Sequence, residues 1–229
     1  MLTSEANRKK PYKWNRDAKN LGVRARVFCS SLSDVFDAEV PQEWRDELWV
    51  VIEQTPNLDW LLLTKRPENI LKMLPLPWLE RLPSHVWVGT SCEDQETLDY
   101  RVRYLKDVRA SVRFLSCEPL LGSLNLKTSI EQEWIDWVIV GGESGSHARS
   151  VQAREPHVDA IVHAIEEIHE QCIDPVHQGK PTIPLFVKQL GTVYARHYGF
   201  EDRKGENPDE WPVRLRAWRE FPVIQLGGV

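Results

Sequence analysis

The chain has 229 residues, a length that suits one large α/β domain with a substantial core. Its residues are 41% hydrophobic and 28% charged, with a net charge of −5, which is typical of a soluble globular protein. No apolar run approaches the ~20 residues of a membrane-spanning helix, and the N-terminus lacks the apolar stretch of a secretory signal, so we expect a cytoplasmic protein with no membrane partner.

The first 26 residues are strongly basic. They carry eight Lys or Arg against Glu5 and Asp17, a net charge of +6 that leaves −11 for the remainder. We assign residues 1–24 to a basic N-terminal arm and consider residues 8–26 as candidate contacts to nucleic acid phosphates. The alternative is a solvated surface segment, which the acidic net charge of the whole chain favours.

Six short apolar runs follow, each ending in polar or charged residues. Each is unbroken and rich in Val, Leu, Ile and aromatic residues, which is typical of strands buried on both faces of a parallel sheet. The runs are RVFCSSLSD (26–34), WLLLTKRP (60–67), VWVGTSCED (86–94), RFLSCEPL (113–120), WVIVGGESG (137–145) and LFVKQ (185–189). Because parallel strands point the same way, we expect their polar ends to gather at one edge of the sheet, where α/β folds bind ligands.

Helical patterns separate these runs. The segment 41–55 carries four apolar residues on one face, namely Trp44, Leu48, Val51 and Ile52. The segment 95–108 and the strongly amphipathic segment 157–172 alternate with the strands at about 25–30 residues per unit, the spacing of βαβ repeats. We therefore predict one domain over residues 1–229, with an incomplete TIM-barrel-like parallel sheet of about six βα units.

The last segment, residues 200–229, is charged, contains prolines and lacks a regular period. We expect an irregular extension that packs on the barrel through Trp211, Trp218 and Phe221. The four cysteines form no CxxC pair and match no zinc or cluster spacing, so we expect buried thiols and no metal site. They are Cys29, Cys92, Cys117 and Cys172.

The run WVIVGGESG carries the clearest candidate motif. Gly141 and Gly142 directly follow a buried strand and would let the backbone approach a ligand closely, with Glu143 at the sheet edge. The alternative is a tight strand-to-loop turn with an exposed glutamate. The run contains neither GxGxxG nor GxSxG, so it is neither a dinucleotide fingerprint nor a nucleophile elbow.

Glu118 ends another run, directly before Pro119. Its carboxylate could bind a ribose, an amine or a metal, or act as a base, or it could pair with Lys65 or Lys188. The adjacent Lys65 and Arg66 suit a carboxylate or phosphate ligand, or an ion pair with Glu118 or Glu143.

Further polar residues end the other runs and complete the candidate pocket. For the segment 30–34, turn and capping chemistry is an equal alternative. The candidate pocket residues are Ser30, Asp34, Thr64, Lys65, Arg66, Thr90, Ser91, Glu93, Ser144, Lys188 and Gln189.

Taken together, these segments resemble a known family. The motifs RVFCSSLSDVFDAEVP, WLLLTKRPENI, VWVGTSCEDQ, VRFLSCEPLLG, IDWVIVGGESG, PLFVKQLG and GENPDEWPVRLRAWREFP occur in this order in the phage-associated three-cysteine-motif family, which is of unknown function. The resemblance covers nearly the whole chain from about Pro11 onward.

The resemblance implies a radical-SAM-like TIM barrel. In that superfamily an N-terminal CxxxCxxC loop holds a [4Fe–4S] cluster, and one iron binds S-adenosylmethionine. By resemblance, Gly141, Gly142 and Glu143 belong to the strand that contacts the adenine. Ser116 and Glu118 resemble the polar contacts to the ribose.

This sequence departs from the family at its N-terminus. It begins just before the family's WNR-like segment, Trp14–Asn15–Arg16, without the three-cysteine loop or the first strand and helix. A fragment, a split protein and a degenerate form are the three explanations. The cofactors S-adenosylmethionine and [4Fe–4S] are implied only if that loop is supplied, and we expect this chain alone to be inactive.

The missing strand would leave an open sheet edge that a partner protein or an N-terminal segment would cover. Two other functions stay open. One is a non-catalytic, phage-derived binding protein that uses the same pocket, with nucleic acid on the basic arm. The other is a TIM-barrel hydrolase with Glu118 and Glu143 as paired carboxylates.

Overall fold

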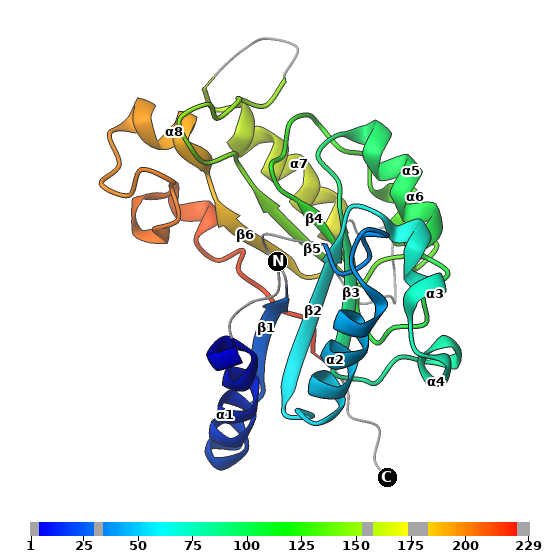
Figure 1. The fold of residues 1–229 in the computed structure, drawn as a ribbon. Coiled ribbons are helices and arrows are strands. Elements are labelled where there is room, and N and C mark those ends of the chain that lie inside the picture. Colours follow the sequence, from blue (N-terminus) through cyan, green and yellow to red (C-terminus); the bar gives the residue numbers. More distant parts are fainter. Residues whose placement is uncertain (1–4, 30–33, 153–157, 174–182, 224–229) are drawn as a thin grey trace.

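The computed structural model describes residues 5–29, 34–152, 158–173 and 183–223. Its six-stranded sheet has the order β1-β2-β3-β4-β5-β6, and every neighbouring pair is parallel. The strands are β1 (Ala25–Cys29), β2 (Leu58–Thr64), β3 (Val86–Ser91), β4 (Arg113–Cys117), β5 (Trp137–Gly141) and β6 (Leu185–Gln189). They form an open half-barrel (Figure 1), which confirms the predicted α/β fold and all six predicted strands.

Helices connect the strands and cover the convex face of the half-barrel (Figure 1). The longer ones are α1 (Glu5–Leu21), α2 (Gln42–Glu53), α5 (Gln95–Leu105), α7 (Ala160–Ile173) and α8 (Gly191–Tyr198). The shorter ones are η1 (Pro67–Asn69), α3 (Ile70–Met73), α4 (Leu76–Glu80), α6 (Lys127–Glu131), η3 (Pro208–Glu210) and η4 (Val213–Leu215). Within the described ranges, no helix combines the length and the apolar character needed to cross a membrane.

Alternation along each strand divides the apolar residues between two layers. In β3, Val86 and Val88 join the large cluster beneath the helices, whereas Trp87 points to the concave side. The same alternation holds in β5, where Val138 lies in the outer cluster and Ile139 in the inner one. The inner cluster is small and built largely of aromatic residues, so the concave face is only partly filled.

Helix α5 matches its predicted face, and α2 matches it in part. In α5, Leu98, Val102 and Leu105 are buried as expected, and Asp94 caps the helix by accepting the backbone N–H of Thr97 at 2.9 Å. In α2, Ile52 is buried and Leu48 and Val51 pack against the core as expected, but Arg45 and Trp49 are buried as well.

The burial of Arg45 in α2 was not predicted. Its guanidinium donates to the backbone carbonyl of Asp37 at 3.0 Å, which holds the preceding loop against the helix. Arg45 and Trp49 therefore extend the buried face beyond the predicted residues, whereas Trp44 is only half-buried.

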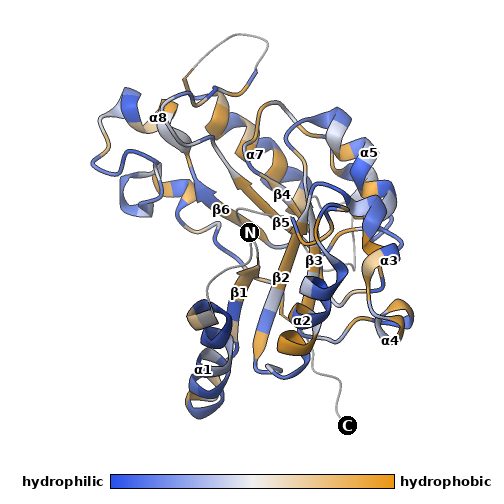
Figure 2. Ribbon diagram, in the orientation of Figure 1, coloured by the Kyte–Doolittle hydropathy of each residue, from blue (hydrophilic) through white to orange (hydrophobic). Residues whose placement is uncertain are grey.

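The basic N-terminal segment, to which the sequence analysis assigned no secondary structure, forms α1. The helix stands beside β1 at the edge of the sheet, and its surface is strongly hydrophilic (Figures 1 and 2). Pro11 and Ala18 are buried against the body. In addition, Asn15 Oδ1 accepts the backbone N–H of Asn57 at 2.8 Å, so the helix is docked rather than extended.

The described part of the C-terminal segment packs on the sheet, with Trp211 buried. It also covers the β6 edge of the sheet. The backbone N–H of Val187 donates to Trp218 at 2.7 Å, and that of Glu220 donates to Leu185 at 2.9 Å. Among the described residues β1 has a neighbouring strand on one side only, so the open edge expected from the sequence lies at β1.

Candidate functional site

A cavity of about 880 Å³ lies on the concave face of the half-barrel. Its floor and walls are largely apolar and aromatic, formed by Phe28, Leu61, Leu63, Trp137, Ile139, Phe186 and Phe221. Its rim is polar and includes Lys65, Ser91, Ser116, Glu118, Glu143, Ser144 and Lys188. An apolar cavity with a few converging polar groups is the usual form of a small-molecule site.

The strand register explains why the floor is apolar and the rim polar. Inward residues of adjacent strands align in rows, one being Leu63–Gly89–Phe114–Trp137. The next row toward the carboxyl ends is Ser91–Ser116–Ile139–Phe186. A Cβ on Gly89 would lie 2.4 Å from the ring of Phe114, so only glycine at this position leaves room for that ring.

Glu118 and Lys188 face each other at the rim. The ammonium Nζ of Lys188 lies 2.8 and 2.9 Å from the two carboxylate oxygens of Glu118. The carboxylate is mostly buried, and the lysine side chain is about half exposed. Of the two partners that the sequence allowed for Glu118, the structure selects Lys188, so the cavity carries a fixed positive and a fixed negative group side by side.

The second charged group at the rim centres on Glu93. Its carboxylate is buried and accepts Lys65 Nζ at 2.6 Å and Arg101 Nη1 at 2.8 Å. Burial alone would raise the pKa of Glu93, but the hydrogen bond from Lys65 and the charge of Arg101 outweigh it, and the pKa is lowered. The ion pair expected for Lys65 is wrong in its partner, because the carboxylate that Lys65 contacts is Glu93 rather than Glu118 or Glu143.

Glu143 is paired with Arg149, which the sequence analysis missed. Arg149 donates to both carboxylate oxygens, from Nη2 at 2.7 Å and from Nε at 2.9 Å, and its backbone N–H adds a third bond at 2.6 Å. These hydrogen bonds lower the pKa of Glu143 to about 2. Such a carboxylate stays ionised at neutral pH and is unsuited to the general-acid step of a paired-carboxylate hydrolase.

The two glycines of WVIVGGESG have a packing role. A Cβ on Gly142 would lie 2.3 Å from the backbone oxygen of Leu190, so the chain after β6 crosses directly over this position. Gln189, which is buried, donates from Nε2 to the carbonyl of Gly142 at 2.8 Å and fixes the crossing. Gly142 lines the cavity as well, whereas Gly141 is not among its lining residues.

Several predicted pocket residues fasten loops instead of lining the cavity. Asp34 accepts the hydroxyl of Thr64 and the backbone N–H of Lys65, both at 2.9 Å, and it pairs with Arg66 at 3.4 Å. The hydroxyl of Thr90 donates to the backbone oxygen of Thr64 at 2.9 Å. Turn chemistry therefore accounts for this group. Ser30 lies outside the described residues.

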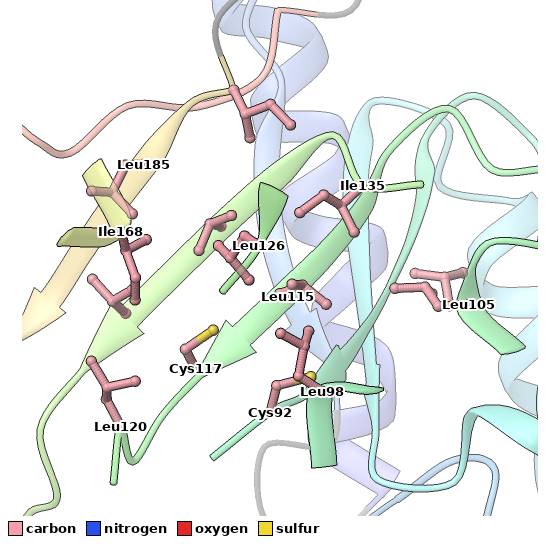
Figure 3. Close-up of a cluster of buried hydrophobic side chains, with 14 of the residues drawn as sticks. Cys92, Leu98, Leu105, Leu115, Cys117, Leu120, Leu126, Ile135, Ile168 and Leu185 are labelled. Atoms are coloured by element: carbon pink, nitrogen blue, oxygen red, sulfur yellow. The ribbon is translucent and has the colours of Figure 1, made fainter. Parts of the chain in front are cut away.

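The cysteines of the described segments do not fit an iron–sulfur cluster. All four are buried. Cys92 and Cys117 lie within the apolar layer beneath the helices (Figure 3), and burial raises the pKa of both thiols. Cluster ligands are thiolates, which this environment disfavours. In the described part of the chain, no three His, Cys, Asp or Glu residues are grouped to hold a metal ion.

Arg26 and Arg219, which line the cavity between β1 and β6, were not predicted as site residues. The guanidinium of Arg26 lies 3.7 Å from the ring centroid of Phe221, and that of Arg219 lies 4.7 Å from the ring of Phe186. These contacts bring the C-terminal segment between the two outer strands. The alternation of side chains in β1 could have predicted part of this, because it places Arg26 and Phe28 on the same face of the strand.

A second hollow, of about 730 Å³, lies near the end of α7. Its amide groups already bond to the protein: Gln171 Nε2 donates to Leu124 O at 2.8 Å, and Gln95 Oε1 accepts the N–H of Asn125 at 2.7 Å. Because these polar groups are satisfied, the concave cavity with its charged rim is the better candidate site.

Comparison with known proteins places the whole chain in one family. The family model described as "Protein of unknown function (DUF5131)" matches residues 1–222. The match includes all six strands and every residue that lines the concave cavity. No curated protein matches the chain. A functional conclusion therefore depends on the chemistry of the cavity.

Proposed function

Because the chain belongs to this family of unknown function, we propose its role from the concave cavity. The chain binds a zwitterionic ligand that carries a flat ring, and S-adenosylmethionine is the first candidate. In this proposal the chain is the ligand-binding half-barrel of a radical-SAM-like enzyme, and the cluster ligands come from elsewhere. The cavity position at the carboxyl ends of parallel strands supports a ligand role.

The Glu118–Lys188 pair is the observation that carries the proposal. An α-amino acid group has an ammonium and a carboxylate a few atoms apart. It can place its ammonium on Glu118 and its carboxylate on Lys188, so that each protein charge exchanges one partner for another. A ligand with a single charge would leave one member of the pair without compensation, and this selects zwitterions.

The remainder of the cavity suits the other parts of such a ligand. The aromatic floor offers Phe28, Trp137 and Phe186 as stacking surfaces for a purine ring. The hydroxyls of Ser91 and Ser116 lie on the wall between floor and rim and can bond a ribose. The family resemblance also implies a ligand at this rim, but it differs in detail, because it gives Glu118 to the ribose and the segment 141–143 to the adenine.

The chemistry of an enzyme of this type would come from a cluster, and the described cysteines do not fit one. We therefore derive no reaction step. The role of this chain in the proposal is to bind the ligand, to exclude water from the apolar floor and to hold the amino acid group in one orientation. The chain by itself is expected to leave the ligand unchanged.

Isothermal titration calorimetry of the chain with four ligands tests the proposal. We expect saturable binding of S-adenosylmethionine and S-adenosylhomocysteine, and at least 10-fold weaker binding of adenosine and of methionine, which each lack part of the match. Glu118→Gln should weaken the first two by at least 10-fold. The matched control is Glu96→Gln, an exposed residue of α5 outside the cavity, which should bind as the unaltered chain. Absence of binding by all four ligands would refute the proposal.

A non-catalytic binding protein is the second candidate, and the buried cysteines favour it. The two candidates differ in the fate of the ligand. If the chain is part of an enzyme, a sample purified anaerobically together with its copurifying proteins should convert bound S-adenosylmethionine. If S-adenosylmethionine is recovered unchanged after a long incubation, a non-catalytic binding function is favoured.

A further inference from the structure

Four cations form a ridge along the exposed side of α1. Lys10, Lys13, Arg16 and Lys19 recur at every third position, and all four are exposed. On a helix, residues three apart are surface neighbours with Cβ atoms about 5–6 Å apart, so the ridge is a continuous row of charge. We name these four residues the α1 ridge.

The α1 ridge faces away from the body of the protein. The opposite side of the helix is buried through Pro11 and Ala18, and Asn15 bonds to Asn57 there. Arg8, outside the ridge, pairs with Glu47 at 2.8 Å. Within the ranges that the structure describes, the four ridge residues have no ion pair, so their charges are available to a partner.

The ridge has an energetic cost that a partner would remove. Neighbouring like charges on a helix repel one another, and the ridge contains three such pairs in succession. Moreover, the basic charge is concentrated in this segment, since residues 1–26 carry +6 and the rest of the chain −11. Segregated charge of this kind is the electrostatic signature of a polyanion-binding surface.

We propose that the α1 ridge binds nucleic acid through its phosphates. A row of regularly spaced cations complements a backbone with one charge per residue. Two exposed aromatic residues flank the row, since Tyr12 lies one turn before Arg16 and Trp14 one turn after Lys10, and both can stack on unpaired bases. An anionic membrane is the less suitable partner, because interfacial helices insert a broad apolar face, whereas the exposed large apolar residues of α1, namely Tyr12, Trp14 and Leu21, are interleaved with its cations.

The test is fluorescence anisotropy of labelled 20-nucleotide single strands and duplexes at 50 and 200 mM salt, with the full chain. We expect binding that weakens over this salt range by roughly 40- to 150-fold for duplexes and by roughly 20- to 50-fold for single strands, as three to four phosphate contacts require. The ridge variant K10Q/K13Q/R16Q/K19Q should weaken binding at 50 mM salt at least 20-fold. Circular dichroism melting is the control for the folding of this variant, which should melt cooperatively.

The matched control removes four exposed cations from other elements, as K72Q/R81Q/R109Q/R196Q. It makes the same change in net charge and should bind within about threefold of the unaltered chain. Equal losses in the two variants would overturn the proposal, because non-specific attraction would then explain the binding. The absence of binding at 50 mM salt would overturn it too, as would cosedimentation with anionic vesicles in place of nucleic acid.

Discussion

Glu118 and Lys188 come from strands that are not neighbours, and their side chains meet across the strand between them. Glu118 directly follows β4, Lys188 lies in β6, and the 2.8 Å contact passes over the end of β5. Gly141 is the residue of β5 at this level, and a Cβ placed on it would lie 3.5 Å from Cγ of Glu118. Such a Cβ would be in ordinary van der Waals contact with Glu118, so the pair lies directly against the backbone of Gly141.

The first prediction separates the structural role of this pair from its binding role. Because Lys188 is half exposed, Lys188→Met should lower the free energy of unfolding by no more than about 1 kcal/mol. That corresponds to a melting temperature lower by about 2–4 °C or less. Affinity for S-adenosylhomocysteine should fall at least 10-fold. A large loss of stability with unchanged affinity would show that the pair is structural only.

A second prediction concerns the pH dependence contributed by Glu143. Folding lowers the pKa of this carboxylate to about 2 through the hydrogen bonds from Arg149, whereas the unfolded value is about 4.3. The stabilisation is therefore fully present above pH ~4.3 and is lost as the pH falls toward 2. The melting temperature of Arg149→Gln should lie below that of the unaltered chain at pH 7, and the difference should shrink between pH ~4.3 and 2.

Carboxyl NMR titration measures the pKa of Glu143 directly. In the unaltered chain Glu143 should titrate near pH 2, and in Arg149→Gln, which loses the guanidinium but keeps the backbone N–H of residue 149, it should titrate at a clearly higher pH. Arg196→Gln, an exposed arginine of α8, is the control and should leave the titration of Glu143 unchanged. An ordinary pKa for Glu143 in the unaltered chain would contradict the paired geometry.

The third prediction tests the packing role of Gly142. In Gly142→Ala the new methyl group would meet the backbone oxygen of Leu190, which cannot rotate away as a side chain could. Overpacking of this kind costs about 1–3 kcal/mol, so we expect a melting temperature lower by about 2–10 °C. Gly122→Ala is the matched control, because its methyl group would have no neighbour within 4 Å. Equal effects of the two substitutions would show that the crossing at Leu190 is not tight.

The fourth prediction concerns the C-terminal segment. The ring of Phe221 packs on Phe186 and Trp137 at centroid distances of 4.9 and 5.5 Å. Since the ring is partly exposed, Phe221→Ala should cost about 2–3 kcal/mol, below the range for a fully buried phenylalanine. The intrinsic fluorescence of Trp137 should change as its surroundings become wetter. Val223→Ala, at a side chain that is 90% exposed, should change neither property.

The fold was predictable because its signals are local. Each strand is a short unbroken apolar run with polar residues after it, and the segments between runs have the helical period, so the strands and α5 follow from the sequence. The burial of Arg45 in α2 was not predictable, because it depends on hydrogen bonds to a loop carbonyl, and no periodicity reveals such a contact.

The candidate site was predictable only in part, because partners come from distant segments. Glu118 was expected at the rim, and polar residues from several strand ends do gather there. Glu118 pairs with Lys188 rather than with Lys65 because the sheet register places the ends of β4 and β6 at the same level on the concave face. The pairing of Glu143 with Arg149 depends on the loop after β5, for which the sequence has no regular period.

The most direct test of the central claim is the affinity of the charge-swapped variant E118K/K188E for S-adenosylmethionine. The swap keeps an ion pair across β5 but exchanges the positions of the two charges. The account predicts a melting temperature within a few degrees of that of the unaltered chain, together with affinity at least 10-fold weaker, because the amino acid group then meets like charges. Undiminished binding by the folded swap would contradict the account.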